Sequence, residues 1–320
     1  MKPCTIANSA VRSDMSTRRD FLKTQLKGAF YLAAGASGLW LPRGVFAGAY
    51  PDISVVTGAP GPAARAAVDA LGGMKRFVKP GQKVVIKPNM SFGKGQAHAT
   101  NTDAGIVREL AVMCLEASAG AVRILDHPTG FSKFCIEDIR QACDPIKPGM
   151  VAAIEDADQF SPVSVSDSWI GFNEADVMKE VLSADVLIAA PKAKEHETTG
   201  VSLSMKGMMG LVYDRQALHG IARLDASIVK LATRLKPQLV VVDATRVLST
   251  NGPHGPGDII AENKVIASAD MVAADAMTVK LCTWNGGRLH PGQIDHIKMA
   301  HEAGLGRMDV ENLQVKQIAV

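Results

Sequence analysis

Short runs of β-branched and apolar residues alternate with helical patterns along the chain from residue 50 onward. Four of these runs, over 83–87, 121–126, 185–190 and 238–243, are apolar at nearly every inner position. A strand of this kind must be buried on both faces, which is typical of a parallel sheet covered by helices. The alternation therefore predicts an α/β fold with a mostly parallel open sheet and helices on both faces.

Weaker patterns place further elements around these four strands. Asp103 is a typical N-cap residue and predicts the start of a long helix that runs to about Ser118. We expect the chain to end in an edge strand over 313–320. Other strands are expected over 52–56, 151–154, 163–165 and 263–267, and other helices over 63–71, 132–142, 174–182, 202–211, 222–235, 271–282 and 293–303.

The first 49 residues have the parts of a twin-arginine export signal in the expected order. Arg18-Arg19 precedes Phe21-Leu22-Lys23, the pattern that the translocation receptor reads. An apolar stretch over 29–41 follows, and it is shorter than the roughly 20 residues that span a bilayer. Ala47-Gly48-Ala49 then supplies a small-residue cleavage site. Met15 lies just before the motif and is an alternative start to Met1.

These features predict a signal peptide over 1–49, followed by a single α/β domain over 50–320. The expected partner is the twin-arginine translocation machinery, and the expected location is the periplasm, without a permanent membrane anchor. The signal also carries the positive charge of the chain, since it holds seven Lys or Arg but only two Asp or Glu. Without it, the formal net charge changes from +3 to −2. This balance gives no indication of a nucleic-acid partner.

Four cysteines follow the signal, and none of them is part of a C-x-x-C pair. We therefore expect no iron–sulfur cluster and no thiolate zinc site from the cysteines of this chain. Cys135 and Cys143 are eight positions apart on an expected helix, which separates them by about 12 Å. That distance is too long for a disulfide unless the helix breaks. The other two cysteines are Cys114 and Cys282.

Polar side chains follow each of the four buried strands. In open α/β sheets, ligands bind in the crevice outside the carboxyl ends of the strands. Four segments that converge on this edge predict a ligand site there. The candidate ligand-binding residues are Lys87, Asn89, Asp126, Lys192, Lys194, Asp243 and Asn251, and the candidate catalytic residues are His196 and Lys206.

Lysines outnumber carboxylates among these candidates, which favours a small anionic ligand. Gathering several ammonium groups is costly unless an anion, or the carboxylates of Asp126 and Asp243, offset their repulsion. A helix expected to begin near Ser202 would add backbone N–H groups for the same anion. The neighbouring lysines would lower the pKa of His196 and keep this side chain neutral, as a base requires.

Several of these motifs resemble a bacterial and archaeal family known as domain of unknown function 362. They are Lys87-Pro88-Asn89, the runs over 191–210 and 268–276, and Asn251-Gly252-Pro253. The resemblance extends from about Ile53 to Trp284. Members often occur among iron–sulfur proteins, in which the cluster lies in an added ferredoxin module. Because no such cysteine run is found in this chain, the resemblance does not imply a cluster here.

The residues leave open the chemistry of the site. His98, His196 and His254 follow expected strands, and imidazole with carboxylate suits a divalent metal, although their spacing matches no compact metal motif. One interpretation is a redox-linked enzyme that uses His196 and Lys206 as acid, base or anion clamp. The other is a non-catalytic periplasmic factor for metal or ligand binding or for maturation. The remaining histidines near the C-terminus, including His296, are expected at the surface.

Overall fold

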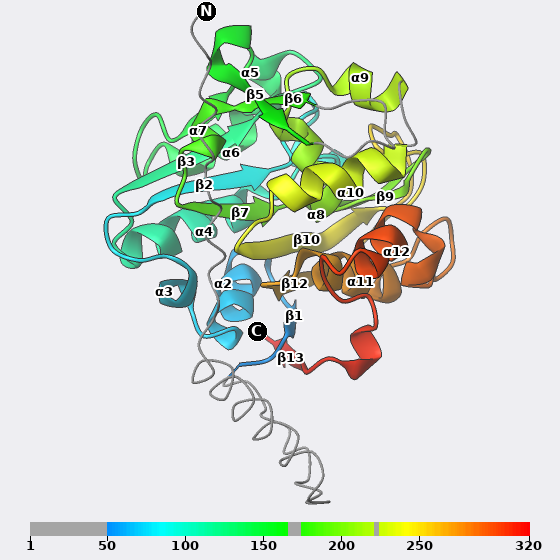
Figure 1. Ribbon diagram of the computed structural model, residues 1–320. Coiled ribbons are helices and arrows are strands. Elements are labelled where there is room, and N and C mark those ends of the chain that lie inside the picture. The colour runs from blue at the N-terminus through cyan, green and yellow to red at the C-terminus, as the bar shows by residue number, and fades with distance from the viewer. Residues whose placement is uncertain (1–49, 166–173, 221–223) are drawn as a thin grey trace, which may run out of the picture. The chain divides into compact units, whose positions relative to one another are not determined.

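The computed structural model describes residues 50–165, 174–220 and 224–320. The predicted export signal and its predicted cleavage site lie outside these residues. The described residues form an 11-stranded sheet with helices packed on it (Figure 1). The main path of the sheet runs in the order β13-β1-β12-β10-β7-β2-β3-β4.

The centre of the sheet consists of the four strands expected from the apolar runs. They are β10 (Leu239–Leu248), β7 (Val186–Ala190), β2 (Lys83–Pro88) and β3 (Ala121–Asp126), and neighbouring strands in this order are parallel. A fifth strand, β4 (Val151–Ala153), continues the parallel arrangement beyond β3. All five strands therefore direct their carboxyl ends toward one edge of the sheet.

The other side of the sheet is mixed in direction. β12 (Lys264–Ser268) is antiparallel to both of its neighbours, β10 and β1 (Ile53–Thr57). β13 (Val315–Ala319) pairs in parallel with β1 and forms the edge, as predicted. The fold is thus an α/β fold with a mixed, mostly parallel open sheet.

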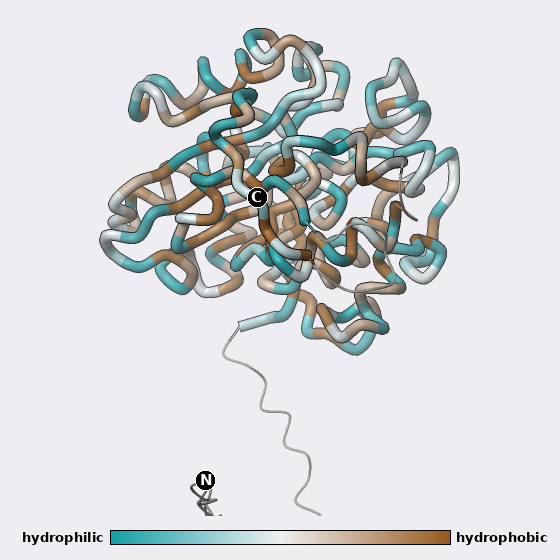
Figure 2. The backbone as a smooth tube through the Cα atoms, turned by 45° about the horizontal axis from the view of Figure 1, so that its top comes forward, coloured by the Kyte–Doolittle hydropathy of each residue, from teal (hydrophilic) through white to brown (hydrophobic). Residues whose placement is uncertain are grey.

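Helices cover both faces of the sheet, and each face has its own hydrophobic core. Val84 and Ile86 of β2 pack in the core that contains α2 (Pro60–Ala70) and α4 (Ala104–Glu116). Val85 between them belongs to the other core, with α10 (Leu224–Arg234), α11 (Met271–Leu281) and α12 (Asp295–Glu302). Successive side chains of a strand point to opposite faces, so an apolar strand contributes to both cores. Figure 2 shows the apolar segments running through the interior.

The predicted cap of α4 is confirmed, because the Asp103 side chain accepts a hydrogen bond from the backbone N–H of Gly105. The shorter elements complete the fold. They are α3 (Met74–Phe77), η1 (Gln96–His98), η2 (Ala157–Gln159), α9 (Arg215–Gly220), β11 (Ile259–Ile260), η4 (Pro291–Gln293) and η5 (Val310–Asn312). Among the helices of the described residues, none is both long and apolar enough to cross a bilayer.

The prediction of a helix over 174–182 is wrong in its first half. Residues Glu174–Met178 form β6, which pairs antiparallel with β5 (Phe160–Ser164), and only α7 (Lys179–Leu182) is helical. Ala175 and Val177 are buried whereas Glu174 and Asp176 are exposed. This alternation has the period of two that a strand requires.

Two other predicted helices are divided. The helix over 132–142 breaks into α5 (Ser132–Cys135) and α6 (Glu137–Cys143), and the four cysteines of the described residues are buried and free. The helix over 202–211 is replaced by the end of β9 (Gly200–Ser202), then α8 (Ser204–Gly207) and η3 (Met208–Leu211). His296 is not at the surface, because it is fully buried on α12 with its Nδ1 atom 3.1 Å from Asp225 Oδ1.

Candidate functional site

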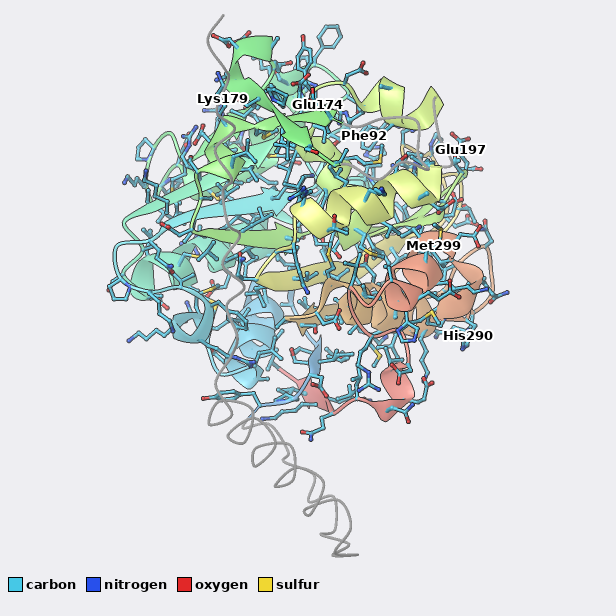
Figure 3. The ribbon with its side chains drawn as sticks, in the orientation of Figure 1. Phe92, Glu174, Lys179, Glu197, His290 and Met299 are labelled. Atoms are coloured by element: carbon cyan, nitrogen blue, oxygen red, sulfur yellow. The ribbon has the colours of Figure 1, made fainter. Side chains whose placement is uncertain are left out.

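A cavity of about 560 Å³ lies at the carboxyl ends of β2 and β7. Its walls come from segments that follow β2 and β3, from β8 (Lys192–His196), from α8 and η3, and from Pro253 and His254. Figure 3 labels two of the lining residues, Phe92 and Glu197, on the side of the sheet toward which β2 and β7 point. The predicted residues that line it are Lys87, Asn89, Lys192, Lys194, His196, Lys206 and His254.

The segment that carries three of these residues is a strand and not the expected loop. β8 begins directly after Pro191, which separates it from β7, and pairs in parallel with β10 and antiparallel with β9. Because side chains alternate along a strand, Lys192, Lys194 and His196 share the face that lines the cavity. Ala193, on the opposite face, belongs to a hydrophobic core.

Two of the cavity lysines are held in buried ion pairs. Lys87 Nζ lies 2.9 Å from Asp126 Oδ1, and Lys192 Nζ lies 2.8 Å from Asp243 Oδ2. Burial lowers the pKa of Lys87, and the Asp126 carboxylate offsets this only in part. Burial acts to raise the pKa of Asp243, but Lys192 and hydrogen bonds from its neighbours lower it overall. Asp126 and Asp243 therefore act as counterions beneath the cavity.

Gly210 makes room for one of these pairs. A Cβ atom at this position would overlap both the Asp126 carboxylate and the Lys87 ammonium group. The backbone of Gly210 also accepts a hydrogen bond from His127 N at 2.9 Å. Glycine is thus needed here because of the close approach of η3 to the ion pair, and not because of an unusual backbone conformation.

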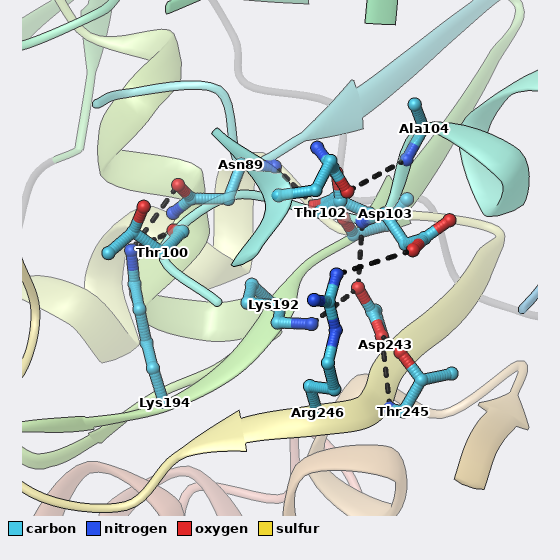
Figure 4. A network of polar contacts seen from close by, with 12 residues as sticks. Asn89, Thr100, Thr102, Asp103, Ala104, Lys192, Lys194, Asp243, Thr245 and Arg246 are labelled. Atoms are coloured by element: carbon cyan, nitrogen blue, oxygen red, sulfur yellow. Dashed lines mark hydrogen bonds and ion pairs between the residues drawn. The ribbon is translucent and has the colours of Figure 1, made fainter. Parts of the chain in front are cut away.

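Asp243 links the cavity to the start of α4 (Figure 4). Its Oδ2 atom accepts hydrogen bonds from Lys192 Nζ at 2.8 Å and from Asp103 N at 2.7 Å. Its Oδ1 atom accepts from the backbone and the hydroxyl group of Thr245, at 3.0 and 2.6 Å. Four donors occupy about all the lone-pair positions of a carboxylate, so Asp243 is fixed as a structural anion.

Lys194 is buried without a carboxylate partner among the described residues. Its Nζ atom donates to Thr100 O at 2.7 Å and contacts Asn89 Oδ1 at 3.3 Å (Figure 4). The same atom lies 4.4 Å from the centre of the Phe92 ring. Burial, followed by the positive charges of Lys206 and Lys87, lowers the pKa of Lys194 well below its usual value.

Lys206, the third residue of α8, also has no carboxylate partner in the described part of the chain. The contact of its Nζ atom is with Met209 Sδ at 4.0 Å. Burial, then Arg215 and Lys87, lowers the pKa of Lys206 to about 8. Arg215 lines the same cavity and donates to Pro128 O at 2.9 Å. The cavity therefore gathers five cationic side chains around the buried carboxylates of Asp126 and Asp243, and the exposed Glu197 and Asp214 also line it.

The N-terminus of α8 is not free for a ligand, contrary to expectation. Asp275 of α11 accepts hydrogen bonds from Ser204 N at 2.9 Å and from Met205 N at 3.0 Å. This carboxylate occupies the N–H groups that were expected to bind an anion. It also fixes the short helix that carries Lys206.

The two histidines that line the cavity near these lysines have opposite tautomers. His196 Nδ1 accepts hydrogen bonds from the backbone N–H groups of Thr198 and Thr199, at 3.2 and 3.4 Å, so the neutral ring carries its proton on Nε2. His127 Nδ1 lies 2.6 Å from Ile154 O, which can only accept, so the lone pair of neutral His127 is on Nε2. In this arrangement neutral His127 can accept a proton on Nε2, whereas neutral His196 can donate one from Nε2.

The three candidate metal ligands do not form one cluster, although His196 and His254 both line the cavity. His98 is exposed on η1, His254 lies beside Phe92 with 5.8 Å between ring centres, and His196 is bonded to its own turn. Within residues 50–165, 174–220 and 224–320, no cluster of three or more His, Cys, Asp or Glu side chains could hold a metal ion. Asn251 is also separate, because its side chain is exposed and donates to Pro256 O.

Comparisons with known proteins agree with the motifs. The family described as Domain of unknown function (DUF362) matches residues 84–280. The thylakoid-associated protein sll1697 of Synechocystis sp. is 28% identical over 219 residues, a match that spans 66% of this chain and 66% of that protein. The lactate racemase apoprotein from Thermoanaerobacterium thermosaccharolyticum has a TM-score of 0.46 at 12% identity, over 68% of this chain and 54% of that one.

The family match begins in β2 and ends in α11. It includes the five cationic side chains of the cavity and both carboxylates beneath them. The match covers more than half of the residues of this chain, and the chain therefore belongs to the DUF362 family.

Proposed function

We propose that the cavity at the carboxyl edge of the sheet binds a small anionic ligand. The observation that carries the proposal is the difference between its buried lysines, since the two other carboxylates that line the cavity, Glu197 and Asp214, are exposed. Lys87 and Lys192 have buried counterions, whereas Lys194 and Lys206 have no carboxylate partner within the described residues. An anion between the last two would provide the missing negative charge.

The physical reason is the cost of burying an ammonium group without a counterion. Such groups respond by releasing their proton, which is the direction in which the pKa values of Lys194 and Lys206 are shifted. A bound anion favours the charged amines, so binding takes up protons. We therefore expect the affinity for anions to fall as the pH rises through about 8, where Lys206 loses its proton.

Isothermal titration calorimetry with acetate, pyruvate, sulfate and inorganic phosphate tests the proposal. We expect at least one of them to bind, and Lys206→Met to weaken its binding about tenfold or more, the effect of losing about 1.4 kcal/mol of charge-assisted hydrogen bonding. Lys147→Met is the matched control, because Lys147 is exposed just before β4, at the amino end of the strands. Wild-type protein that binds none of the four, or equal affinity in Lys206→Met, would contradict the proposal.

Catalysis is favoured by one specific observation. The cavity holds an amine whose pKa is close to 8 and an imidazole, His127, whose lone pair is available on Nε2. A general base requires a pKa near the working pH. The alternative, a non-catalytic factor for ligand binding or maturation, requires the cations of the cavity, but it requires neither a lowered pKa at Lys206 nor a lone pair on His127.

We also propose that the protein is exported to the periplasm by the twin-arginine pathway. The support is the sequence of the first 49 residues, above all Arg18-Arg19. Replacing both with lysine should keep the protein in the cytoplasmic fraction, whereas Arg12→Lys, a control outside the motif, should not change export. Normal export of the double variant would refute this proposal.

A further inference from the structure

We propose that Lys206 forms a Schiff base with the carbonyl carbon of an anionic carbonyl compound of the 2-oxo acid class. This inference rests on the proposed anion site and adds that the ligand carries a carbonyl group. It assigns different roles to lysines that the sequence alone presents as equivalent.

The surroundings of Lys206 differ from those of the two lysines that are paired with carboxylates. Lys87 and Lys192 are each within 2.9 Å of a buried carboxylate oxygen. The contact of Lys206 Nζ is a thioether sulfur at 4.0 Å, a weak acceptor that does little to stabilise an ammonium group. The helix that carries Lys206 is at the same time fixed by two hydrogen bonds to Asp275.

The neighbouring cations act in the same direction. Arg215 and Lys87 both disfavour a positive charge on Lys206, and burial adds to their effect, so its pKa is about 8. A lysine becomes a nucleophile when it is desolvated or placed beside another cation, because the neutral amine then has a free lone pair. At pH 7 an amine with this pKa is roughly 10% neutral, against about 0.03% for an ordinary lysine.

One of these cations, Arg215, also supplies a binding site for a carboxylate. Arg215 lines the cavity together with Lys206, and a guanidinium group matches the geometry of a carboxylate. In a 2-oxo acid the carbonyl carbon is directly bonded to the carboxylate. Holding the carboxylate on Arg215 therefore presents the carbonyl carbon to a nearby amine.

The reaction needs no oxidant or further reactant. The lone pair of Lys206 Nζ attacks the carbonyl carbon, and a proton moves from nitrogen to oxygen to give a carbinolamine. The C–O bond then breaks, the oxygen leaves as water, and the C=N bond of the imine forms. His127, with its Nε2 lone pair, and His196, with its Nε2 proton, line the same cavity and are suited to move these protons.

Reductive trapping of the full-length protein tests the inference. The protein is incubated at pH 7 with sodium cyanoborohydride and one of three 2-oxo acids: pyruvate, 2-oxobutyrate or 2-oxoglutarate. Intact mass spectrometry should then show one adduct with the mass of the 2-oxo acid less one oxygen atom, and peptide mapping should place it on Lys206. The exposed Lys147 is an internal reference, and we expect at least about tenfold more label on Lys206. Acetate has no ketone or aldehyde carbonyl and should compete with labelling without forming an adduct.

The variant Lys206→Arg separates the two proposals. Arginine keeps the positive charge but cannot form an imine, so this variant should lose the adduct, while in calorimetry it should bind acetate more tightly than Lys206→Met does. If wild-type protein binds anions but its label is absent, or is spread evenly over exposed lysines, the Schiff base is refuted and the anion site stands. If neither anion binding nor labelling is found, both proposals fail.

Discussion

Lys192 and Lys194 provide a direct test of how charge is distributed in the cavity. Both belong to β8, both are about 1% exposed, and their side chains lie on the same face of the strand. They differ in their partners, because Lys192 is paired with the buried Asp243 at 2.8 Å and Lys194 has no carboxylate partner in the described chain. Replacing each with methionine, an unbranched side chain, keeps much of the volume and removes the charge.

We expect the two substitutions to have very different effects on the free energy of unfolding. Lys192→Met leaves Asp243 buried without its counterion, which costs about 3–5 kcal/mol. Lys194→Met loses a hydrogen bond to Thr100 O, worth about 1 kcal/mol, and a contact with the Phe92 ring, worth about 0.5–2 kcal/mol. Removal of a desolvated amine offsets these losses, and the Asn89 amide, with its nitrogen toward Thr100, can donate to the same carbonyl at 3.1 Å.

We therefore predict that Lys194→Met stays within about 1 kcal/mol of wild type, while Lys192→Met loses at least about 3 kcal/mol. Equilibrium unfolding in urea measures both, with the fluorescence of the buried Trp284 and circular dichroism as separate probes. Equal destabilisation by the two substitutions, or a neutral Lys192→Met, would refute the reasoning about counterions.

Two further predictions concern the ion pair beneath η3 and the alkaline pH range. Gly210→Ala should destabilise the protein by about 1–3 kcal/mol in urea unfolding and weaken anion binding, because the added methyl group overlaps Asp126 and Lys87. The control variant Gly207→Ala places its methyl group in open space and should change the stability little. Normal stability and normal anion binding of Gly210→Ala would contradict this prediction. The pKa of Lys206 is about 8 when folded and about 10.5 when unfolded, so the unfolded chain binds more protons between these values and the free energy of unfolding should rise with pH across that range. Lys206→Met should reduce this rise, as measured by urea unfolding at pH 8 and pH 10 in buffers without small anions, and an unchanged slope would argue against the shifted pKa.

The central strands could be predicted because their signal is local. Residues 83–87 and 185–190 are apolar runs whose burial on both faces leaves few alternatives to a parallel sheet. The same signal identified the edge at which Lys87, Asn89, Lys192 and His196 meet. β8 was not predicted as a strand because most of its residues are charged or polar. Its two lysines are nevertheless two positions apart, the spacing that places them on one face of a strand.

Other parts of the site depend on contacts that no local pattern records. Asp275 binds the start of α8 from about 70 positions away in the chain, and the tautomer of His127 follows from a carbonyl group that is 27 positions away. Asn251 follows β10 and was expected at the cavity, but its turn directs the side chain to Pro256. The order of residues after a strand indicates the edge of the sheet, whereas the path of each loop decides which side chains reach the cavity.

The two buried ion pairs imply that some residues of the site can be substituted during evolution more easily than others. A substitution at Lys192 or Asp243 leaves the other residue charged and buried without a counterion until it is also replaced. Either single substitution therefore lowers the stability of the folded protein. Within residues 50–165, 174–220 and 224–320, Lys194 and Lys206 have no such ion pair, so we expect that each can be exchanged in one step without loss of the fold. Related proteins could therefore acquire new ligands through substitutions at the positions of Lys194 and Lys206, while the two buried ion pairs stay the same.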